Sequence, residues 1–425
     1  MTGDPRAWLR GAFECAVAAA QPAQAIAQLS LEPPHHGRTV VVGAGKAAAG
    51  MAAALEARLI ALGWPASALP APSSRVVTRY GHGLSHGGRI AVLEASHPLP
   101  DEAGASAGIA MLRAVGELGA SDLVIALISG GGSALLCAPY GVTLAQKIAL
   151  TSELLRCGAE IAEINAVRKH LSLIKGGRLA AATRARVLSL IVSDVVGDDP
   201  SSIASGPTAP DATSYADALA ILERYDVRAD EARAHLQRGA RGELAETPKP
   251  GDPLFERVEN RLIVTNRCAL EAARSSLERN ALHARTLSDA VTGEARLAAI
   301  EHAAHARKLS PGQALVSGGE TTVTVRGQGR GGRNLEFLLA LAIELGDDAG
   351  IHALAADSDG VDGTEQAAGA LIAPDTLSRA AKLGLEPRAM LADNDAYTFF
   401  AALGDLVVTG PTGTNVNDVR CVLRI

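Results

Sequence analysis

Short runs of β-branched and aliphatic residues alternate along most of the chain with longer Ala- and Leu-rich segments of helical period. The apolar runs RTVVV, DLVIALIS and RVLSLIVS are each followed by a segment that predicts a helix, at 46–62, 144–156 and 215–225. This alternation is typical of a parallel sheet covered by helices. We therefore expect an α/β fold.

The alternation is interrupted at 226–255, where the sequence becomes charged and then rich in proline and glycine. A new strand is predicted directly afterwards, at NRLIVTN. Because 425 residues exceed what one hydrophobic core usually serves, we expect two domains, at 1–240 and 255–425. The opening segment, 4–29, predicts one amphipathic helix that could pack on either domain.

Composition narrows the class of protein. Hydrophobic residues make up 48% and charged residues 20%, which is typical of a globular protein. A net charge of −6 and only 3% aromatic residues argue against nucleic acid as a partner. The polar start of the chain and the lack of a long apolar run argue against secretion and membrane insertion. Five scattered cysteines fit a reducing compartment, so we expect a cytoplasmic protein and leave a homodimer open.

The first glycine-rich turn, VVVGAGKAAAGMA, places Gly43 and Gly45 between a predicted strand and a predicted helix. The spacing matches a loose dinucleotide fingerprint. That fingerprint expects an acidic residue at the end of the second strand, where this chain has Arg79 and Tyr80. The match to a nicotinamide site is therefore weak.

Lys46 is predicted to open the helix after this turn. A Walker A loop is excluded because Ala47 follows the lysine where Ser or Thr would be needed. A cation in the first turn of a helix opposes the helix dipole unless an anion lies between them. Lys46 is either a solvated lysine or part of a site for carboxylate or phosphate.

A second turn, LVIALISGGGSALL, ends an apolar strand with three consecutive glycines. Three glycines in a row cost backbone entropy and favour close approach of a ligand to main-chain N–H groups. We interpret this turn as a phosphate cradle, with a merely tight connection as the alternative. Its residues are Ser129, Gly130, Gly131, Gly132 and Ser133.

Asp194 stands just beyond the C-terminal end of a third apolar strand, in SLIVSDVVGDDPSSIASGPTAPD. Ligands of open α/β sheets bind at this edge, and a carboxylate there can accept a hydroxyl proton or hold Mg²⁺. Asp198 is a second candidate metal ligand, and Asp199 lies beside it. We expect one of the three aspartates to be only a capping or turn residue.

Basic residues also mark two other segments. EINAVRKHLSLIKGGRLAAA predicts one long helix whose Asn165 and Arg168 either belong to a solvated face or reach a substrate carboxylate. Farther on, GGETTVTVRGQGRGGRNLEFLLALA predicts a hairpin-like strand pair, a glycine-rich stretch and a Leu-rich helix. Arg330 and Arg333 precede that helix, and Arg333 is the better candidate for binding phosphate because it adjoins the helix start.

Two loops in the second half supply further polar candidates. AADSDGVDG follows a predicted strand and includes Asp357, although its spacing does not fit an EF-hand. VVTGPTGTNVNDVR places Thr409 and Thr412 in a loop between two strands. That loop suits nucleotide contacts and a plain turn equally well.

Taken in order, the motifs GAGKAAAGMA, ASHPLPDEAG, LISGGGSALL, INAVRKHLSLIKGGRLA, SDVVGDDPSSIASGPTAPD, SGGETTVTVRGQGRGGRNLE, AADSDGVDG and TGPTGTNVNDV resemble the glycerate 2-kinase family with its C-terminal MOFRL domain. The resemblance spans nearly the whole chain. It implies a Rossmann-like first domain, a smaller α/β second domain, and an active site in the cleft between them.

The resemblance also implies an activity, in which ATP and Mg²⁺ convert D-glycerate to 2-phosphoglycerate. The family's functional lysine, aspartate and arginine fall on Lys46, Asp194 and Arg333. We expect Asp194 to accept the proton of the substrate hydroxyl, and the two cations to hold the phosphoryl group and the carboxylate. The rival interpretations are an NAD(P)H-dependent hydroxypyruvate reductase and a non-enzymatic anion-binding or scaffolding protein.

Overall fold

The computed structural model describes residues 3–83, 87–346 and 350–425. These residues form two compact units. One unit is Pro22–Ile263, and the other joins the chain up to Gln21 with Val264–Ile425. The sequence predicted the first 21 residues in the domain 1–240, whereas the structure groups them with Val264–Ile425. No described helix is both long and apolar enough to span a bilayer.

The unit Pro22–Ile263 is built on a six-stranded sheet of order β3-β2-β1-β4-β5-β6. The pairs β2–β3, β1–β2, β1–β4 and β4–β5 are parallel, which confirms the expected α/β fold with a Rossmann-like sheet. The strands are β1 (Thr39–Ala44), β2 (Arg75–Arg79), β3 (Ala91–Ala95), β4 (Leu123–Ile128), β5 (Arg186–Val192) and β6 (Val258–Val264).

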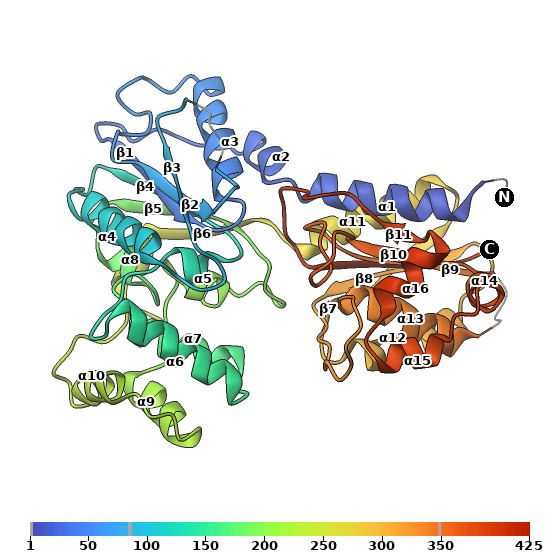
Figure 1. Ribbon diagram of the computed structural model, residues 1–425. Coiled ribbons are helices and arrows are strands. Elements are labelled where there is room, and N and C mark those ends of the chain that lie inside the picture. Colours follow the sequence, from blue (N-terminus) through green and yellow to red (C-terminus); the bar gives the residue numbers. More distant parts are fainter. Residues whose placement is uncertain (1–2, 84–86, 347–349) are drawn as a thin grey trace. The chain divides into compact units, whose positions relative to one another are not determined.

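Central strands β1 and β4 are buried along their whole length, as expected for a sheet covered on both faces. Figure 1 places α6, α7, α9 and α10 together in a separate layer beyond the sheet. Their facing apolar side chains form a hydrophobic cluster of their own. The helices of this unit are α2 (Pro22–Ala27), α3 (Ala48–Ala61), α4 (Glu102–Gly116), α5 (Gly132–Leu135), α6 (Leu144–Arg156), α7 (Ile161–His170), α8 (Arg178–Ala181), α9 (Tyr215–Arg224) and α10 (Asp230–Ala240), with 3-10 turns η1 (Ile203–Ser205) and η2 (Pro253–Arg257).

The long helix predicted over 163–182 is wrong. Helix α7 ends at His170, and only the short α8 follows. The Ser172 hydroxyl accepts the N–H groups of Ile174 and Lys175, which gives the backbone an alternative to helix. Two successive glycines at positive φ then reverse the chain. The segment 226–255, expected to be a linker, contains α10 and belongs to this unit.

The unit of Val264–Ile425 is built on a second, mixed sheet of order β11-β10-β9-β12-β8-β7. Its pairs are antiparallel except for β7–β8, which is parallel. The strands are β7 (His283–Val291), β8 (Gln313–Gly319), β9 (Ile351–Asp357), β10 (Gly369–Ile372), β11 (Leu406–Val407) and β12 (Asp418–Arg424).

Helices α12, α13 and α16 contribute to the main apolar core of this unit. The Leu-rich helix α13 begins at Arg333 as expected, but the hairpin predicted before it is absent from the described residues, because 321–325 forms only an isolated bridge at Thr322. The helices are α11 (Asn266–Arg279), α12 (Ala295–Ala306), α13 (Arg333–Leu345), α14 (Thr376–Lys382), α15 (Pro387–Ala392) and α16 (Ala396–Leu403).

The N-terminal segment also belongs to this unit, where α1 (Pro5–Ala19) packs against α11. The single helix predicted over 4–29 is instead two helices, broken before Pro22. Proline lacks an N–H and disfavours helical geometry in the residue before it. Polar contacts from α1 and its C-terminal end, Arg6 to Asp405 at 2.7 Å and the Thr414 hydroxyl to the Ala20 carbonyl at 2.6 Å, hold it to the unit.

Candidate functional site

Polar side chains gather at the carboxyl edge of the parallel sheet. Strands β1 and β4 lie side by side at its centre, and the chain leaves them toward opposite edges, β1 to β2 and β4 to β5. Ligands of open α/β sheets bind at such a switch point, just beyond the strand ends. The turn 45–47 follows β1 and the turn 129–131 follows β4.

The two turns are bonded to each other. The Lys46 N–H donates to the Gly130 carbonyl at 2.8 Å, and the Ala47 N–H donates to the Ser129 hydroxyl at 3.1 Å. A Cβ at Gly45 would lie 2.0 Å from that hydroxyl, so only glycine fits there. Helix α3 begins at Ala48, so Lys46 lies in the turn before the helix rather than in its first residue.

The glycine-rich turn faces the side chains predicted to act. A Cβ at Gly130 would lie 1.9 Å from Oδ2 of Asp194, and a Cβ at Gly131 would lie 3.3 Å from Cγ of Lys46. Gly131 has φ 78°, a left-handed conformation that favours glycine. Among the described residues, no protein acceptor takes the N–H of Gly130 or Gly131.

Asp194 follows β5, next to β4, and so reaches the same edge as Lys46. Of the two aspartates that follow, Asp199 is the turn residue. Its carboxylate accepts the N–H and hydroxyl of Ser201 and the hydroxyl of Ser202, which closes the turn before η1. Asp198 is partly buried and has φ 56°.

His97 is a residue of this site that the sequence reasoning did not single out, although it lies in the motif ASHPLPDEAG. A Cβ at Gly131 would lie 3.1 Å from its Cδ2 and Nε2 atoms, so the ring packs on the glycine-rich turn. Burial, followed by the positive charges of Lys46 and Arg79, lowers the pKa of His97 to about 4. The imidazole is therefore neutral at pH 7.

Asn165 and Arg168 lie one turn apart on α7, beside the residues that follow the glycine-rich turn. The Ser205 hydroxyl is 2.8 Å from that of Ser133 and donates to Oδ1 of Asn165 at 3.1 Å. Ser205, which the sequence reasoning missed, has φ 60°. Burial lowers the pKa of Arg168.

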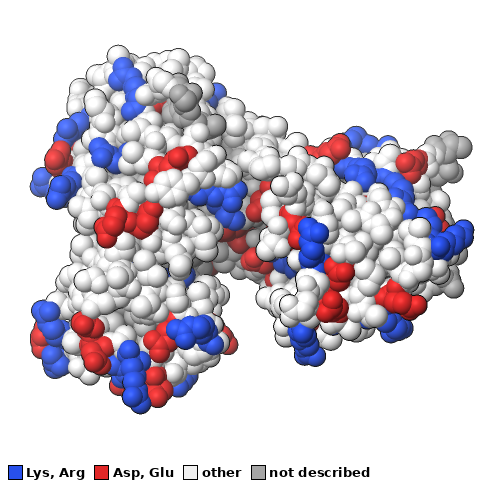
Figure 2. Space-filling view, in the orientation of Figure 1, with Lys and Arg blue, Asp and Glu red and all other residues white. Residues whose placement is uncertain are grey.

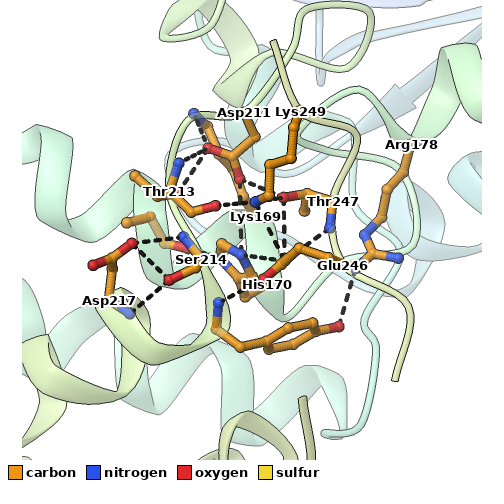
Figure 3. Close-up of polar contacts among 12 residues, drawn as sticks. Lys169, His170, Arg178, Asp211, Thr213, Ser214, Asp217, Glu246, Thr247 and Lys249 are labelled. Carbon is orange, nitrogen blue, oxygen red and sulfur yellow. Dashed lines mark hydrogen bonds and ion pairs between the residues drawn. The ribbon is translucent and has the colours of Figure 1, made fainter. Parts of the chain in front are cut away.

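The C-terminal end of α7 is anchored by the polar network of Figure 3. Lys169 forms a buried ion pair with Asp211 at 3.1 Å, and His170 lies 2.9 Å from a Glu246 oxygen. Asp211 also accepts the hydroxyls of Thr213 and Thr247. This network ties the helix to two loops and so fixes the direction of Asn165 and Arg168. By contrast, the outer helices α9 and α10 carry interspersed positive and negative side chains (Figure 2).

Arg333 lies in the other unit and is held by that unit's own carboxylates. Its Nε donates to Asp418 at 2.8 Å and its Nη2 pairs with Asp357. Burial lowers the pKa of Arg333, but Asp418 and Asp357 outweigh it and raise that pKa above its usual value. Asp362 accepts the N–H groups of Asn334 and Leu335 and thus caps α13. The helix dipole therefore gives no reason to expect an external anion here.

The remaining candidates of this unit form loop contacts. The Thr412 hydroxyl donates to the Ser358 carbonyl at 2.5 Å, and that of Thr409 donates to the Gly410 carbonyl at 2.8 Å. The Thr412 contact joins the loop after β11 to the loop after β9, which follows Asp357. Arg330 pairs with Glu365 and stacks on the ring of Tyr397, so it is engaged within the unit.

A cavity of about 480 Å³ adjoins the glycine-rich stretch of this unit. Thr321, Val323, Gly331 and Arg333 are among its lining residues. The Arg333 side chain is 21% exposed, so part of it remains accessible.

Comparison with known proteins assigns the family. The family described as "Domain of unknown function (DUF4147)" matches residues 8–237, and the MOFRL family matches residues 313–418. A protein of Pyrococcus horikoshii named glycerate 2-kinase is 39% identical over 90% of this chain and 86% of its own length. The chain belongs to the glycerate 2-kinase family. The resemblance inferred from the motifs is thus confirmed.

Two further relatives match nearly the whole chain and carry different names. A crystal structure of glycerate kinase from Thermotoga maritima matches with a TM-score of 0.87 and 36% identity, covering 99% of this chain and 100% of that chain. A protein of Agrobacterium vitis named "Putative hydroxypyruvate reductase" is 51% identical over 98% of this chain and 93% of its own length. Both names therefore occur among relatives of this chain.

Proposed function

We propose that this chain is a glycerate 2-kinase, which transfers the γ-phosphoryl group of ATP to the 2-hydroxyl of D-glycerate and yields 2-phospho-D-glycerate and ADP. The observation that carries the proposal is the meeting of Lys46, Asp194 and the Gly130–Gly131 turn at the carboxyl ends of β1, β4 and β5. A cation, available N–H groups and a carboxylate are the groups that phosphoryl transfer needs.

Each of these groups has a distinct role. Asp194 accepts the proton of the attacking hydroxyl, since a carboxylate can do so within hydrogen-bond reach. Lys46 and the N–H groups of Gly130 and Gly131 stabilise the negative charge on the transferring phosphoryl group. Neutral His97 adds no competing positive charge and packs against the same turn. For Arg333, a catalytic role remains a prediction.

The residues present are compatible with Mg²⁺. Among the described residues, no three or more His, Cys, Asp or Glu side chains are grouped so that they could hold a metal ion by themselves. Mg²⁺ usually takes only one or two carboxylates together with substrate phosphates, so Asp194 and Asp198 suffice as candidate ligands. Such an ion would neutralise charge on the phosphates of bound ATP.

NMR of the product tests the reaction. The protein is incubated with ATP, MgCl₂ and D-glycerate, and ³¹P and ¹³C spectra distinguish the 2-phosphate from the 3-phosphate. We expect the 2-phosphate and one ADP per product. The absence of any phosphorylated glycerate would reject the proposal, and a 3-phosphate product would reject its regiochemistry.

The second candidate is an NAD(P)H-dependent hydroxypyruvate reductase, favoured by the name of the relative at 51% identity. A ribose-binding acid would be expected at the end of β2, but that strand ends at Arg79. Oxidation of NADPH or NADH followed at 340 nm with hydroxypyruvate separates the two activities. We expect no oxidation above the protein-free rate.

A further inference from the structure

Three basic side chains, the buried Lys147 and Lys175 and the partly buried Arg168, lie around the C-terminal end of α7 and the η1 turn without a carboxylate to balance them. Lys147 donates to the Leu171 carbonyl at 2.8 Å and Lys175 donates to the Ala204 carbonyl at 3.3 Å. Arg168 donates only weakly, to Oδ1 of Asn165 at 3.5 Å. Among the described residues, none of the three forms an ion pair.

Charges without partners are costly in a protein interior. Burial, and then the charges of Lys147 and Arg168, hold the pKa of Lys175 well below its usual value. Burial lowers the pKa of Lys147 to about 8. The cluster thus lacks a negative charge, and an anion at Arg168, the most exposed of the three side chains, would supply one.

Asn165 presents its amide nitrogen to the same place. Its Oδ1 atom accepts from both Ser205 and Arg168, so the amide oxygen is already used while the NH₂ group keeps its two donors. The residue is 94% buried, since only 6% of it is exposed. Among the described residues this nitrogen has no protein acceptor. Asn165 and Arg168 are three residues apart on α7, and such residues share one helix face.

Ser205 is held in place by unusual backbone geometry. Ala204 and Ser205 have φ values of 52° and 60°, which non-glycine residues rarely adopt. Such strain persists only where the surroundings enforce it, and it often occurs at functional sites. Here the Lys175 contact to the Ala204 carbonyl and the Ser133 hydroxyl fix the turn. The Ser205 hydroxyl is then directed at Asn165.

We propose that Arg168 and the amide nitrogen of Asn165 bind the carboxylate of the hydroxy acid, with Ser205 as the positioning residue that orients the amide. This proposal rests on the proposed function and assigns the end of the substrate opposite to the transferring phosphoryl group. Ser133 connects the subsite to the glycine-rich turn, because its neighbour Gly132 begins α5 directly after Gly131. The subsite and the phosphate cradle therefore adjoin on one turn.

The first test replaces the charge. Arg168→Gln and Asn165→Asp should each raise the KM for D-glycerate by about 100-fold, because each removes or opposes a charge-assisted hydrogen bond. The KM for ATP should stay within about twofold, since the phosphate cradle is untouched. Arg228→Gln, at an exposed arginine with a side chain 86% accessible, is the matched control.

The second test separates the Ser205 hydroxyl from the strained backbone. Ser205→Ala and Ser205→Gly both remove the hydroxyl, but only glycine relieves the left-handed strain. We expect both variants to raise the KM for glycerate by about tenfold. This is the effect of losing one hydrogen bond, from the Ser205 hydroxyl to Asn165. A normal KM in Ser205→Ala would overturn the positioning role.

Binding measured without turnover separates this proposal from the activity itself. D-glycerate should raise the Tm of the wild-type protein and of Arg228→Gln, but not that of Arg168→Gln. If wild type transfers no phosphate yet shows this pattern, the proposed function fails and the subsite stands. If wild type is an active kinase and Arg168→Gln and Asn165→Asp keep its KM for glycerate, the subsite is rejected.

Discussion

The two glycine-rich segments of this protein, 129–133 and 327–332, look alike in sequence and differ in what surrounds them. At Gly130 and Gly131 a Cβ would meet Asp194, His97 and Lys46, all side chains at the carboxyl edge of the parallel sheet. The N–H groups of these two glycines donate to no acceptor among the described residues. The N–H groups of this turn are thus available to a ligand.

The second segment packs against its own unit. A Cβ at Gly327 would lie 2.2 Å from the Asp393 carbonyl, and one at Gly329 would lie 2.3 Å from Cβ of Asp395. The N–H groups at and just before its start are already used: those of Arg326 and Gly327 donate to Oδ1 of Asn394 at 2.8 and 3.0 Å, and that of Gly329 donates to the Asp393 carbonyl at 2.9 Å. Glycine there serves close packing of two loops. A glycine-rich sequence therefore indicates close approach, but the approaching group can be a ligand or the protein itself.

The largest effect is expected at Asp194, the carboxylate beside the glycine-rich segment 129–133. Asp194→Asn should lower kcat with D-glycerate by on the order of 10³-fold, because an amide cannot accept the hydroxyl proton. Steady-state kinetics measures this, and circular dichroism checks that the fold is retained. A kcat within about threefold of wild type would show that Asp194 is not the base.

Exchanging one glycine in each segment breaks the comparison most directly. Gly130→Ala places a methyl group against Asp194 and should lower kcat/KM by about 100-fold through misplacement of the carboxylate. Gly327→Ala should instead destabilise its unit by about 1–3 kcal/mol, because the methyl group overlaps backbone that cannot easily yield. Paired kinetics and urea denaturation distinguish the two. Equal effects on stability and activity in both variants would refute the contrast.

Asn394, which accepts N–H groups at the start of the second segment, should affect stability and not activity. Asn394→Ala removes the acceptor of the N–H groups of Arg326 and Gly327 and one of the two donors to the carboxylate of Glu336, which keeps Arg296. We expect a loss of about 1–3 kcal/mol in the free energy of unfolding, measured by urea denaturation, because buried polar groups lose their partner. The matched substitution Asn415→Ala, at a partly exposed loop position, removes only the acceptor of the Asn417 N–H and should cost less.

The smallest effect concerns the protonation of His97, whose ring packs on the glycine-rich segment 129–133. Because the folded pKa of His97, about 4, lies below its unfolded value of 6.5, the unfolded chain binds more protons between these values. This residue's contribution to stability therefore falls as the pH drops from 6.5 to 4. NMR titration should show the pKa of His97 rising in Lys46→Met. An unchanged pKa of His97 in this variant would mean that the charge of Lys46 does not act on the ring. In His97→Gln, the free energy of unfolding should fall less steeply between pH 6.5 and 4 than in wild type.

The sequence by itself determined the strands and the chemistry that follows them. Buried runs of β-branched residues fixed β1, β4 and β5, and polar residues directly after such runs had to lie at one edge of a parallel sheet. Lys46, Asp194 and the glycine-rich turn could therefore be named in advance. Helix α6 has the bounds that were predicted from its helical period, and the structure shows that a capping box of Thr143 and Gln146 begins it.

Only the tertiary structure decided the partners of each charge. Nothing local to Arg333 indicated that Asp357 and Asp418, from distant segments, neutralise it. His97 and Ser205 lie within two of the motifs, but nothing in those motifs singled them out, because their roles depend on neighbours brought from other segments. Likewise the helix predicted through Ser172 ended early, since side-chain hydrogen bonds to the backbone competed with helical propensity. Local pattern depends on chain neighbours, whereas pairing depends on which segments the sheet brings together.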